Sequence, residues 1–136
     1  MRGFSFLYCG ILLLFGVQSR ATHVVGGDLN YLWLAGNNYK ITLTVYRDCR
    51  NGVPPFDPQA SIGIFDKFDT LITQLLVPVN DSVPVPNINN GNCIIPTTTI
   101  CYKAAHYYVN VNLPPRAGGY QLVYERCCRN WTIANI

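Results

Sequence analysis

Apolar and polar residues alternate along much of this chain, in short runs that begin after Gly26. The clearest run covers residues 39–46, where apolar and polar side chains take turns. Successive side chains of a β-strand point to opposite faces, so the alternation predicts a strand with one buried face. The residues that would share this face are Tyr39, Ile41, Leu43 and Val45.

Turn-forming residues separate this run from its neighbours. Residues 28–34 are expected to pair with 39–46 as a hairpin, because the turn Ala35-Gly36-Asn37-Asn38 contains residues that tolerate positive φ. Other runs rich in β-branched and aromatic residues predict strands at 60–66, 71–77, 104–113 and 120–126.

Two connections between the runs differ in character. The segment Asp66-Lys67-Phe68-Asp69 is short and polar, which predicts a hairpin turn. Residues 78–96 are rich in Pro, Asn and Gly and are too many for a simple turn, so we expect an exposed loop there.

Short strands without helical periodicity favour an all-β fold, an antiparallel β-sandwich of immunoglobulin-like type over residues 22–136. Residues 131–136 are apolar and β-prone and do not resemble a polar tail. We therefore expect an interrupted strand there, a sandwich incomplete at its C-terminus, and an N-terminal module of a longer chain.

The first 21 residues have a different pattern. Arg2 precedes an apolar run at 4–17, and the small-residue segment Ser19-Arg20-Ala21 follows it. This order is typical of a secretory signal peptide, and the run is shorter than the roughly 20 residues that span a bilayer. We expect cleavage between Ala21 and Thr22, a secreted or cell-surface location, and membrane contact only during export.

Loss of this segment makes the chain almost neutral. Arg2 and Arg20 leave with it, so eight Lys and Arg face seven Asp and Glu. Nucleic-acid binding depends on an excess of positive charge, which a near-neutral domain does not supply. Nucleic acid is therefore excluded as the expected partner.

The segment after the signal peptide carries an odd number of cysteines. In an exported protein these are disulfide candidates, and one of them has no partner within the set. We expect one long bridge from Cys49 to either Cys127 or Cys128, and a short one from Cys93 to Cys101. The candidates are Cys49, Cys93, Cys101, Cys127 and Cys128.

Catalytic and metal-binding patterns are weak. His106 has no cysteine-protease signature near it, and Ser61 and Ser82 lie in no nucleophile elbow. The adjacent Cys127-Cys128 pair lacks the spacing of a zinc site. We expect no enzyme activity, no cofactor and no bound metal, and calcium binding at scattered loop aspartates stays open: Asp48, Asp57, Asp66, Asp69 and Asp81.

Aromatic residues offer a second function class. Exposed aromatic rings on one sheet face could stack against sugar rings, although strands favour aromatic residues for packing alone. The candidates for glycan stacking are Tyr31, Trp33, Tyr107 and Trp131.

Several strings resemble the N-terminal region of large secreted Bacteroidetes multidomain proteins. They are ATHVVGGD at 21–28, YKITLTVYRDC at 39–49, SIGIFD at 61–66, GGYQLVYERCCRN at 118–130 and TIANI at 132–136. The most specific parts are Tyr46-Arg47-Asp48-Cys49 and Arg126-Cys127-Cys128-Arg129-Asn130, and the similarity spans nearly all of residues 22–136.

The resemblance implies a place in a larger assembly. Proteins of this kind typically continue into PKD-like or other immunoglobulin-like modules and end in a gliding-motility-associated sorting domain for type IX secretion. The implied role is a non-enzymatic structural or adhesin-like module. Its partners would be downstream β modules of the parent chain and surface glycans or proteins, and a carbohydrate-binding module is the alternative.

Overall fold

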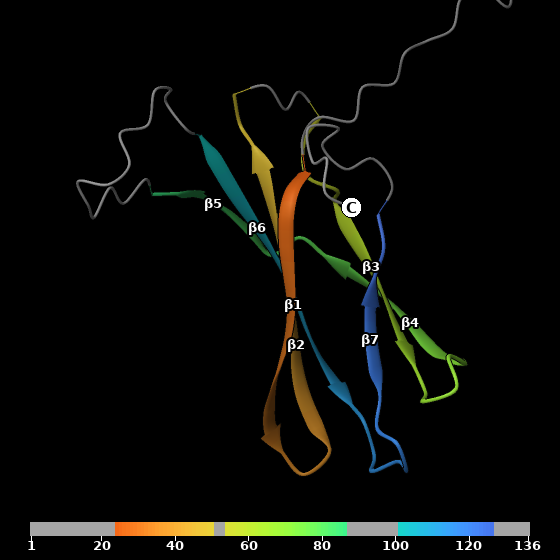
Figure 1. Cartoon of the computed structure of the whole chain (residues 1–136). Coiled ribbons are helices and arrows are strands. Elements are labelled where there is room, and N and C mark those ends of the chain that lie inside the picture. Colours follow the sequence, from red (N-terminus) through yellow and green to blue (C-terminus); the bar gives the residue numbers. More distant parts are fainter. Residues whose placement is uncertain (1–23, 51–53, 87–100, 127–136) are drawn as a thin grey trace, which may run out of the picture.

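The computed structural model describes residues 24–50, 54–86 and 101–126, and these form an all-β fold of two antiparallel sheets packed together (Figure 1). The four-stranded sheet has the order β1-β2-β6-β5, and the three-stranded sheet has the order β4-β3-β7. The strands are β1 (Val24–Ala35), β2 (Asn38–Asp48), β3 (Gln59–Phe65), β4 (Leu71–Pro78), β5 (Asp81–Val85), β6 (Tyr102–Asn112) and β7 (Gln121–Tyr124). The expected antiparallel β-sandwich is confirmed, and the finer immunoglobulin-like assignment stays a prediction.

The hairpin of β1 and β2 forms where the alternation predicts it, and both strands extend beyond the predicted ends. Gly36 follows β1 with φ of 56°, a conformation that costs glycine little because it has no Cβ. On its other side β2 pairs with β6 without a register shift, from Asn38 opposite Asn112 to Asp48 opposite Tyr102. Strand β2 therefore lies inside the larger sheet, and the positions of both β1 and β6 are set by their pairing with it.

The core lies between the sheets and uses the predicted face of β2. Ile41, Leu43 and Val45 are almost fully buried there, and they pack with alternate residues of β3, including Ile62 and Ile64. Full burial of one such aliphatic side chain contributes roughly 1.5–3 kcal/mol. The buried cluster comprises Ile41, Leu43, Val45, Ala60, Ile62, Ile64, Val77, Ala105 and Tyr107.

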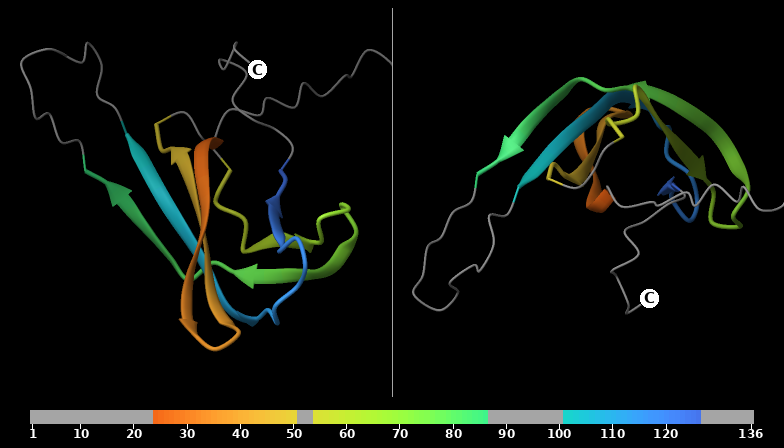
Figure 2. Two further views of the ribbon diagram at one scale, coloured as in Figure 1. Left: turned by 60° about the horizontal axis from the view of Figure 1, so that its bottom comes forward. Right: turned by 90° about the horizontal axis from the view of Figure 1, so that it is seen from above.

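One long segment passes from the smaller sheet to the larger one. Strand β4 ends at Pro78 and β5 begins at Asp81, and the two strands form an arch from one sheet to the other in the right-hand view of Figure 2. The corner is fixed by two main-chain hydrogen bonds, from Val79 N to the Pro58 carbonyl (3.0 Å) and from Asn80 N to the His106 carbonyl (2.9 Å).

The prediction of a loop over all of residues 78–96 is wrong, because Asp81–Val85 form strand β5. Pro84 suggested a loop, since proline cannot donate a hydrogen bond to a sheet. At an edge, however, one side of the strand needs no donor, and among the described strands β5 pairs with β6 alone. The strands expected at 60–66, 71–77, 104–113 and 120–126 are present with small shifts of their ends.

Several expectations fall outside the described residues: the signal peptide at 1–21 with its cleavage site at Ala21 and Thr22, the strand at 131–136, and Cys93, Cys127, Cys128 and Trp131. In the part of the chain that the structure describes, no helix is long and apolar enough to cross a membrane.

Candidate functional site

A disulfide bond closes one end of the larger sheet. It joins Cys49, just after β2, to Cys101, just before β6, with their Cα atoms 5.4 Å apart. A main-chain hydrogen bond of 3.0 Å from Cys49 N to the Cys101 carbonyl extends the ladder to the same point. The bond closes a loop across 52 residues, which corresponds to a contribution of about 4 kcal/mol in the chain-entropy model.

This pairing corrects both bridges expected from the sequence. Cys49 does not bond Cys127 or Cys128, and Cys101 does not bond Cys93, because Cys49 and Cys101 bond each other. The physical reason is the register of β2 and β6, which are antiparallel neighbours and bring their flanking cysteines opposite each other.

Tyr107 belongs to the core and not to a glycan surface, so its assignment as a stacking residue is wrong. Only 2% of the residue is exposed, and its hydroxyl donates a 2.8 Å hydrogen bond to the Asp57 carbonyl. Burial raises the pKa of Tyr107 to about 12, with a smaller contribution from the Asp57 carboxylate. The Asp57 carboxylate itself forms a two-pronged ion pair with the Arg126 guanidinium, at 2.8 Å for each contact.

The opposite end of the β1–β2 hairpin exposes large apolar side chains. We call residues 31–34 of β1 the aromatic strand end: Tyr31, Leu32, Trp33 and Leu34. Tyr31 and Trp33 are 67% and 59% exposed, and Leu32 and Leu34 are 61% and 43% exposed. Four consecutive exposed residues of this size make an apolar surface that needs an explanation, whereas single exposed ones do not.

The two rings of the aromatic strand end share one face of β1. Tyr31 lies opposite Ile41 and Trp33 opposite Tyr39, so both rings emerge on the face that forms the core further along β2. The Trp33 indole N–H donates to the Gly36 carbonyl at 2.9 Å, and Tyr31 meets Tyr39 edge-on with ring centres 6.1 Å apart. These contacts hold the rings in fixed orientations.

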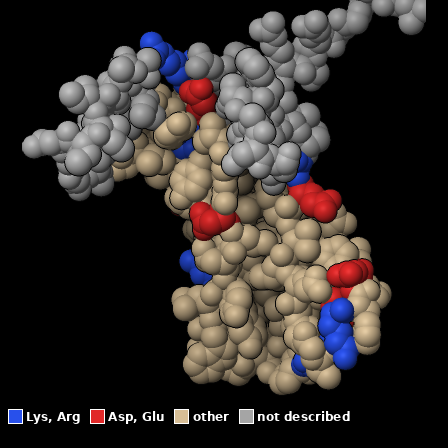
Figure 3. Space-filling view, viewed as in Figure 1, with Lys and Arg blue, Asp and Glu red and all other residues tan. Residues whose placement is uncertain are grey.

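One charged side chain of β2 lies beside this end: Lys40 is opposite Leu32, on the face away from the two rings. The space-filling view shows no Lys, Arg, Asp or Glu over the lower part of the β1–β2 hairpin on the face drawn (Figure 3). Within β1 the single charged residue is Asp28, whose carboxylate accepts a hydrogen bond from Asn30 Nδ2 at 3.0 Å. The face that carries Tyr31 and Trp33 therefore suits an uncharged partner.

His106 occupies the other face of the larger sheet. Its Nδ1 lies 2.5 Å from Asp81 Oδ1, and the two side chains are 31% and 49% exposed. The pair links edge strand β5 to β6. Ser82 pairs with Ala105, so its side chain emerges on the opposite face from His106 and its hydroxyl does not reach this histidine.

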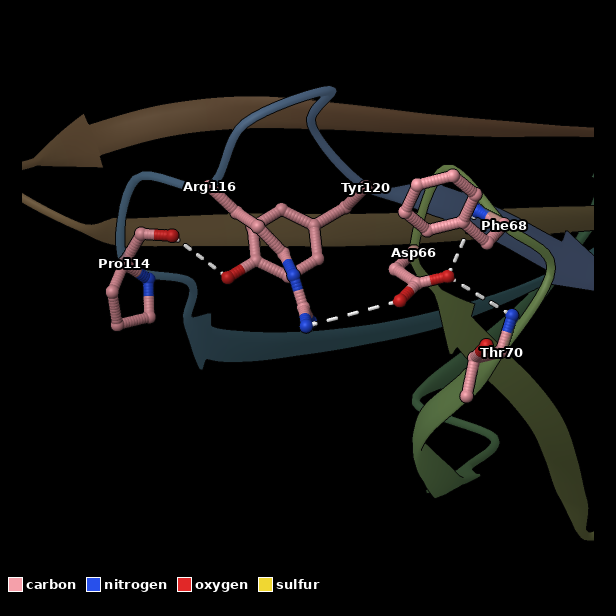
Figure 4. A network of polar contacts seen from close by, with 6 residues as sticks. All are labelled: Asp66, Phe68, Thr70, Pro114, Arg116 and Tyr120. Carbon is pink, nitrogen blue, oxygen red and sulfur yellow. Dashed lines mark hydrogen bonds and ion pairs between the residues drawn. The ribbon is translucent and has the colours of Figure 1, made fainter.

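Asp66 organises the turn between β3 and β4. Its Oδ1 accepts hydrogen bonds from the main-chain N–H groups of Phe68 (2.9 Å) and Thr70 (3.0 Å), and its Oδ2 lies 3.8 Å from Arg116 Nη2 (Figure 4). Hydrogen bonds from the Thr70 and Phe68 main chain lower the pKa of Asp66, assisted by the positive charge of Arg116.

The loop aspartates considered for calcium binding contact different local partners. Asp48 accepts a 2.7 Å hydrogen bond from Arg50 N, Asp57 pairs with Arg126, and Asp81 pairs with His106. Over residues 24–50, 54–86 and 101–126, no group of three or more His, Cys, Asp or Glu side chains could hold a metal ion.

The sequence prediction of exposed aromatic residues selected Tyr31 and Trp33 but missed Leu32 and Leu34. A signal for them was present: residues 31–34 are apolar at four successive positions, which breaks the alternation expected of a strand with one buried face. Such a run places large side chains on both faces of the strand.

Comparison with known proteins adds no assignment: no family model, no curated protein and no solved structure matches this chain. The similarity to secreted Bacteroidetes proteins stays a prediction from the sequence.

Proposed function

We propose that this chain is a non-enzymatic secreted or cell-surface module, structural or adhesin-like, at the N-terminus of a longer gliding-motility-associated type protein. The observation that carries the proposal is the aromatic strand end, an exposed apolar surface held on a hairpin of a disulfide-closed sheet. The signal-peptide pattern supports export, and the motifs around Cys49 and Arg126 support the place in the parent chain.

The geometry supports contact with another macromolecule. Tyr and Trp are enriched among the residues that contribute most to protein interfaces, because they bury a large area at a small cost in conformational entropy. Trp33 is already oriented by its bond to the Gly36 carbonyl, so less freedom is lost on binding. The proposed partners are surface glycans or proteins, with downstream β modules of the parent chain as covalent neighbours.

The test is retention of the exported chain on coated surfaces. Beads that carry the chain are washed over surfaces of mucin glycoprotein, of collagen and of bare glass. Retention on one coat should fall when Tyr31 and Trp33 are both replaced by Ala, and should persist in Phe68→Ala. Phe68 is a matched control, since it is 74% exposed but lies on the β3–β4 turn. Equal loss in both variants, or no retention at all, would refute the adhesin role.

A carbohydrate-binding module is the second candidate, favoured by one observation. Tyr31 and Trp33 present exposed rings on the same face of β1, the arrangement that successive sugar rings require for stacking. A glycan array should show binding that Trp33→Ala removes and Phe68→Ala retains. A silent array would reject this candidate and leave the protein-binding form of the adhesin proposal.

A further inference from the structure

Strand β1 has one open edge. It pairs with β2 along one side, and among the described strands none pairs with its other side. The strand is 12 residues long, and its residues, VVGGDLNYLWLA, include neither Lys nor Pro. A long edge strand with a row of unpaired main-chain groups is a template for another strand, and sheet proteins normally block such edges.

The edge strands of the molecule differ in how they are blocked. Strand β5 contains Pro84 and begins with Asp81, and β7 is only four residues long. Strand β4 is apolar but carries no aromatic residue, and its most exposed large side chain is Leu76, at 64%. Among the described edge strands, β1 alone combines length, lack of Lys and Pro, and exposed aromatic side chains.

We propose that β1 pairs antiparallel with β1 of a second copy of this chain, about a two-fold axis that passes beside Leu32. In that register Leu32 lies opposite Leu32 of the second copy, and Tyr31 lies opposite Trp33 of the second copy. A two-fold axis perpendicular to the sheet keeps equivalent faces together, so aromatic residues meet on one face and leucines on the other.

The second copy is the occupant because the strand is complementary to itself. Every position from Tyr31 to Trp33 is apolar, and cross-strand pairs of aromatic or aliphatic side chains stabilise antiparallel sheets. The ladder between β1 and β2 is uninterrupted from Gly26 to Trp33, so the central residues of the contact belong to regular strand.

Charge also permits this register. Asp28 is the one charged residue of β1 and lies four positions from the axis, so the two carboxylates are separated by about eight residues of strand. At about 3.3 Å per residue this distance is roughly 26 Å, well beyond the screening length of about 10 Å at ordinary ionic strength. No like charges oppose each other along the contact.

Pairing would join the two larger sheets into one eight-stranded sheet. It would also place the ring pairs of both copies side by side on one face, which doubles the aromatic surface. The contact is small, so we expect association that depends on concentration. This goes beyond the proposed function, and its test measures self-association without any ligand.

The first experiment is sedimentation velocity of the exported chain over a wide range of protein concentration. Leu32→Lys would place two ammonium groups opposite each other at the axis and should raise the dimer dissociation constant roughly tenfold or more. Leu76→Lys is the matched control, since Leu76 is 64% exposed and Leu32 61%. The control should leave both the dissociation constant and the melting temperature unchanged. Because Leu32 lies opposite Lys40 of the same hairpin, the second variant is Leu32→Glu, whose carboxylate is compatible with Lys40 within the chain but opposes its own copy at the axis. It should also raise the dissociation constant, and it should keep the melting temperature of the parent.

The second experiment fixes the register. In Leu32→Cys, antiparallel pairing brings the two substituted positions within roughly 4.5–5.5 Å, so mild oxidation should join them. Peptide mass spectra without reduction identify that bond, and Leu76→Cys treated in the same way should give no equivalent peptide. A monomer at every concentration would overturn the proposal. So would association that survives Leu32→Lys, or cross-links from β1 to β4 of the second copy.

Discussion

The Tyr107 hydroxyl donates a 2.8 Å hydrogen bond to the main-chain carbonyl of Asp57, a residue 50 positions earlier in the chain. Tyr107 extends from the larger sheet, and Asp57 lies just before β3 of the smaller one. The Asp57 side chain meanwhile pairs with Arg126, which follows β7. Asp57 therefore joins the two sheets. Its main-chain carbonyl contacts β6, its carboxylate contacts the residue that follows β7, and Asp57 itself precedes β3.

Removal of this hydroxyl should destabilise the sandwich. Tyr107→Phe keeps the ring in the core but leaves the Asp57 carbonyl without its donor, at a cost of about 1–2 kcal/mol. Urea denaturation followed by circular dichroism measures the loss. Tyr108→Phe is the control, because Tyr108 is 40% exposed, and it should change the unfolding free energy by much less. Similar losses in the two variants would refute the role of the Tyr107 hydroxyl.

Alkaline pH should unfold the protein through the same tyrosine. The pKa of Tyr107 is raised from 10.0 to about 12, and desolvation also raises the pKa of Tyr124. A raised pKa means that the folded state favours the neutral phenol. Its stabilisation is complete below pH 10 and is lost as the pH rises toward 12.

The measurement is a paired titration of tyrosinate absorbance and circular dichroism. The tyrosines that ionise last should do so together with the loss of β-structure, and Tyr107→Phe should reduce the number of late-ionising tyrosines by one. Complete ionisation at pH 10 with the fold intact would contradict the prediction.

The sequence predicted the parts of the fold that depend on local pattern. Ile41, Leu43 and Val45 alternate with polar residues, so both the strand and its buried face follow from side-chain geometry. Strand β5 was missed because Pro84 argues against a strand unless its position at an edge is known.

The site was predicted only in part, because it depends on which strands are neighbours. Tyr107 and Tyr108 are adjacent aromatics on opposite faces of β6, and no local pattern shows which of them is buried. The partner of Cys49 likewise follows from the pairing of β2 with β6, which is a property of the topology. Tyr31 and Trp33 were selected by residue type, and their exposure required the structure.

Loss of the Cys49–Cys101 bond should weaken the fold more than loss of the Cys93 thiol. The double variant Cys49→Ser with Cys101→Ser should lower the unfolding free energy by about 3–4 kcal/mol, since the open loop regains chain entropy. Urea denaturation without reductant measures the change. Cys93→Ser is the control and should keep the 49–101 bridge in a non-reducing peptide map. If Cys93→Ser destabilises the chain as strongly and removes that bridge, the assigned pairing is wrong.

Acid should weaken the β3–β4 turn through Asp66. Its pKa is lowered from the ordinary 3.8, mainly by hydrogen bonds from Thr70 N and Phe68 N and further by the charge of Arg116. A lowered pKa means that the folded state favours the carboxylate, so its stabilisation is present above pH 3.8 and is lost as the pH falls through the lower folded value. Asp66→Asn should therefore melt below the parent at neutral pH, and the two melting temperatures should converge in acid. Thermal melts of both proteins across this range provide the measurement. A gap that stays constant down to the lowest pH would show that the turn depends on the shape of the side chain and not on its charge.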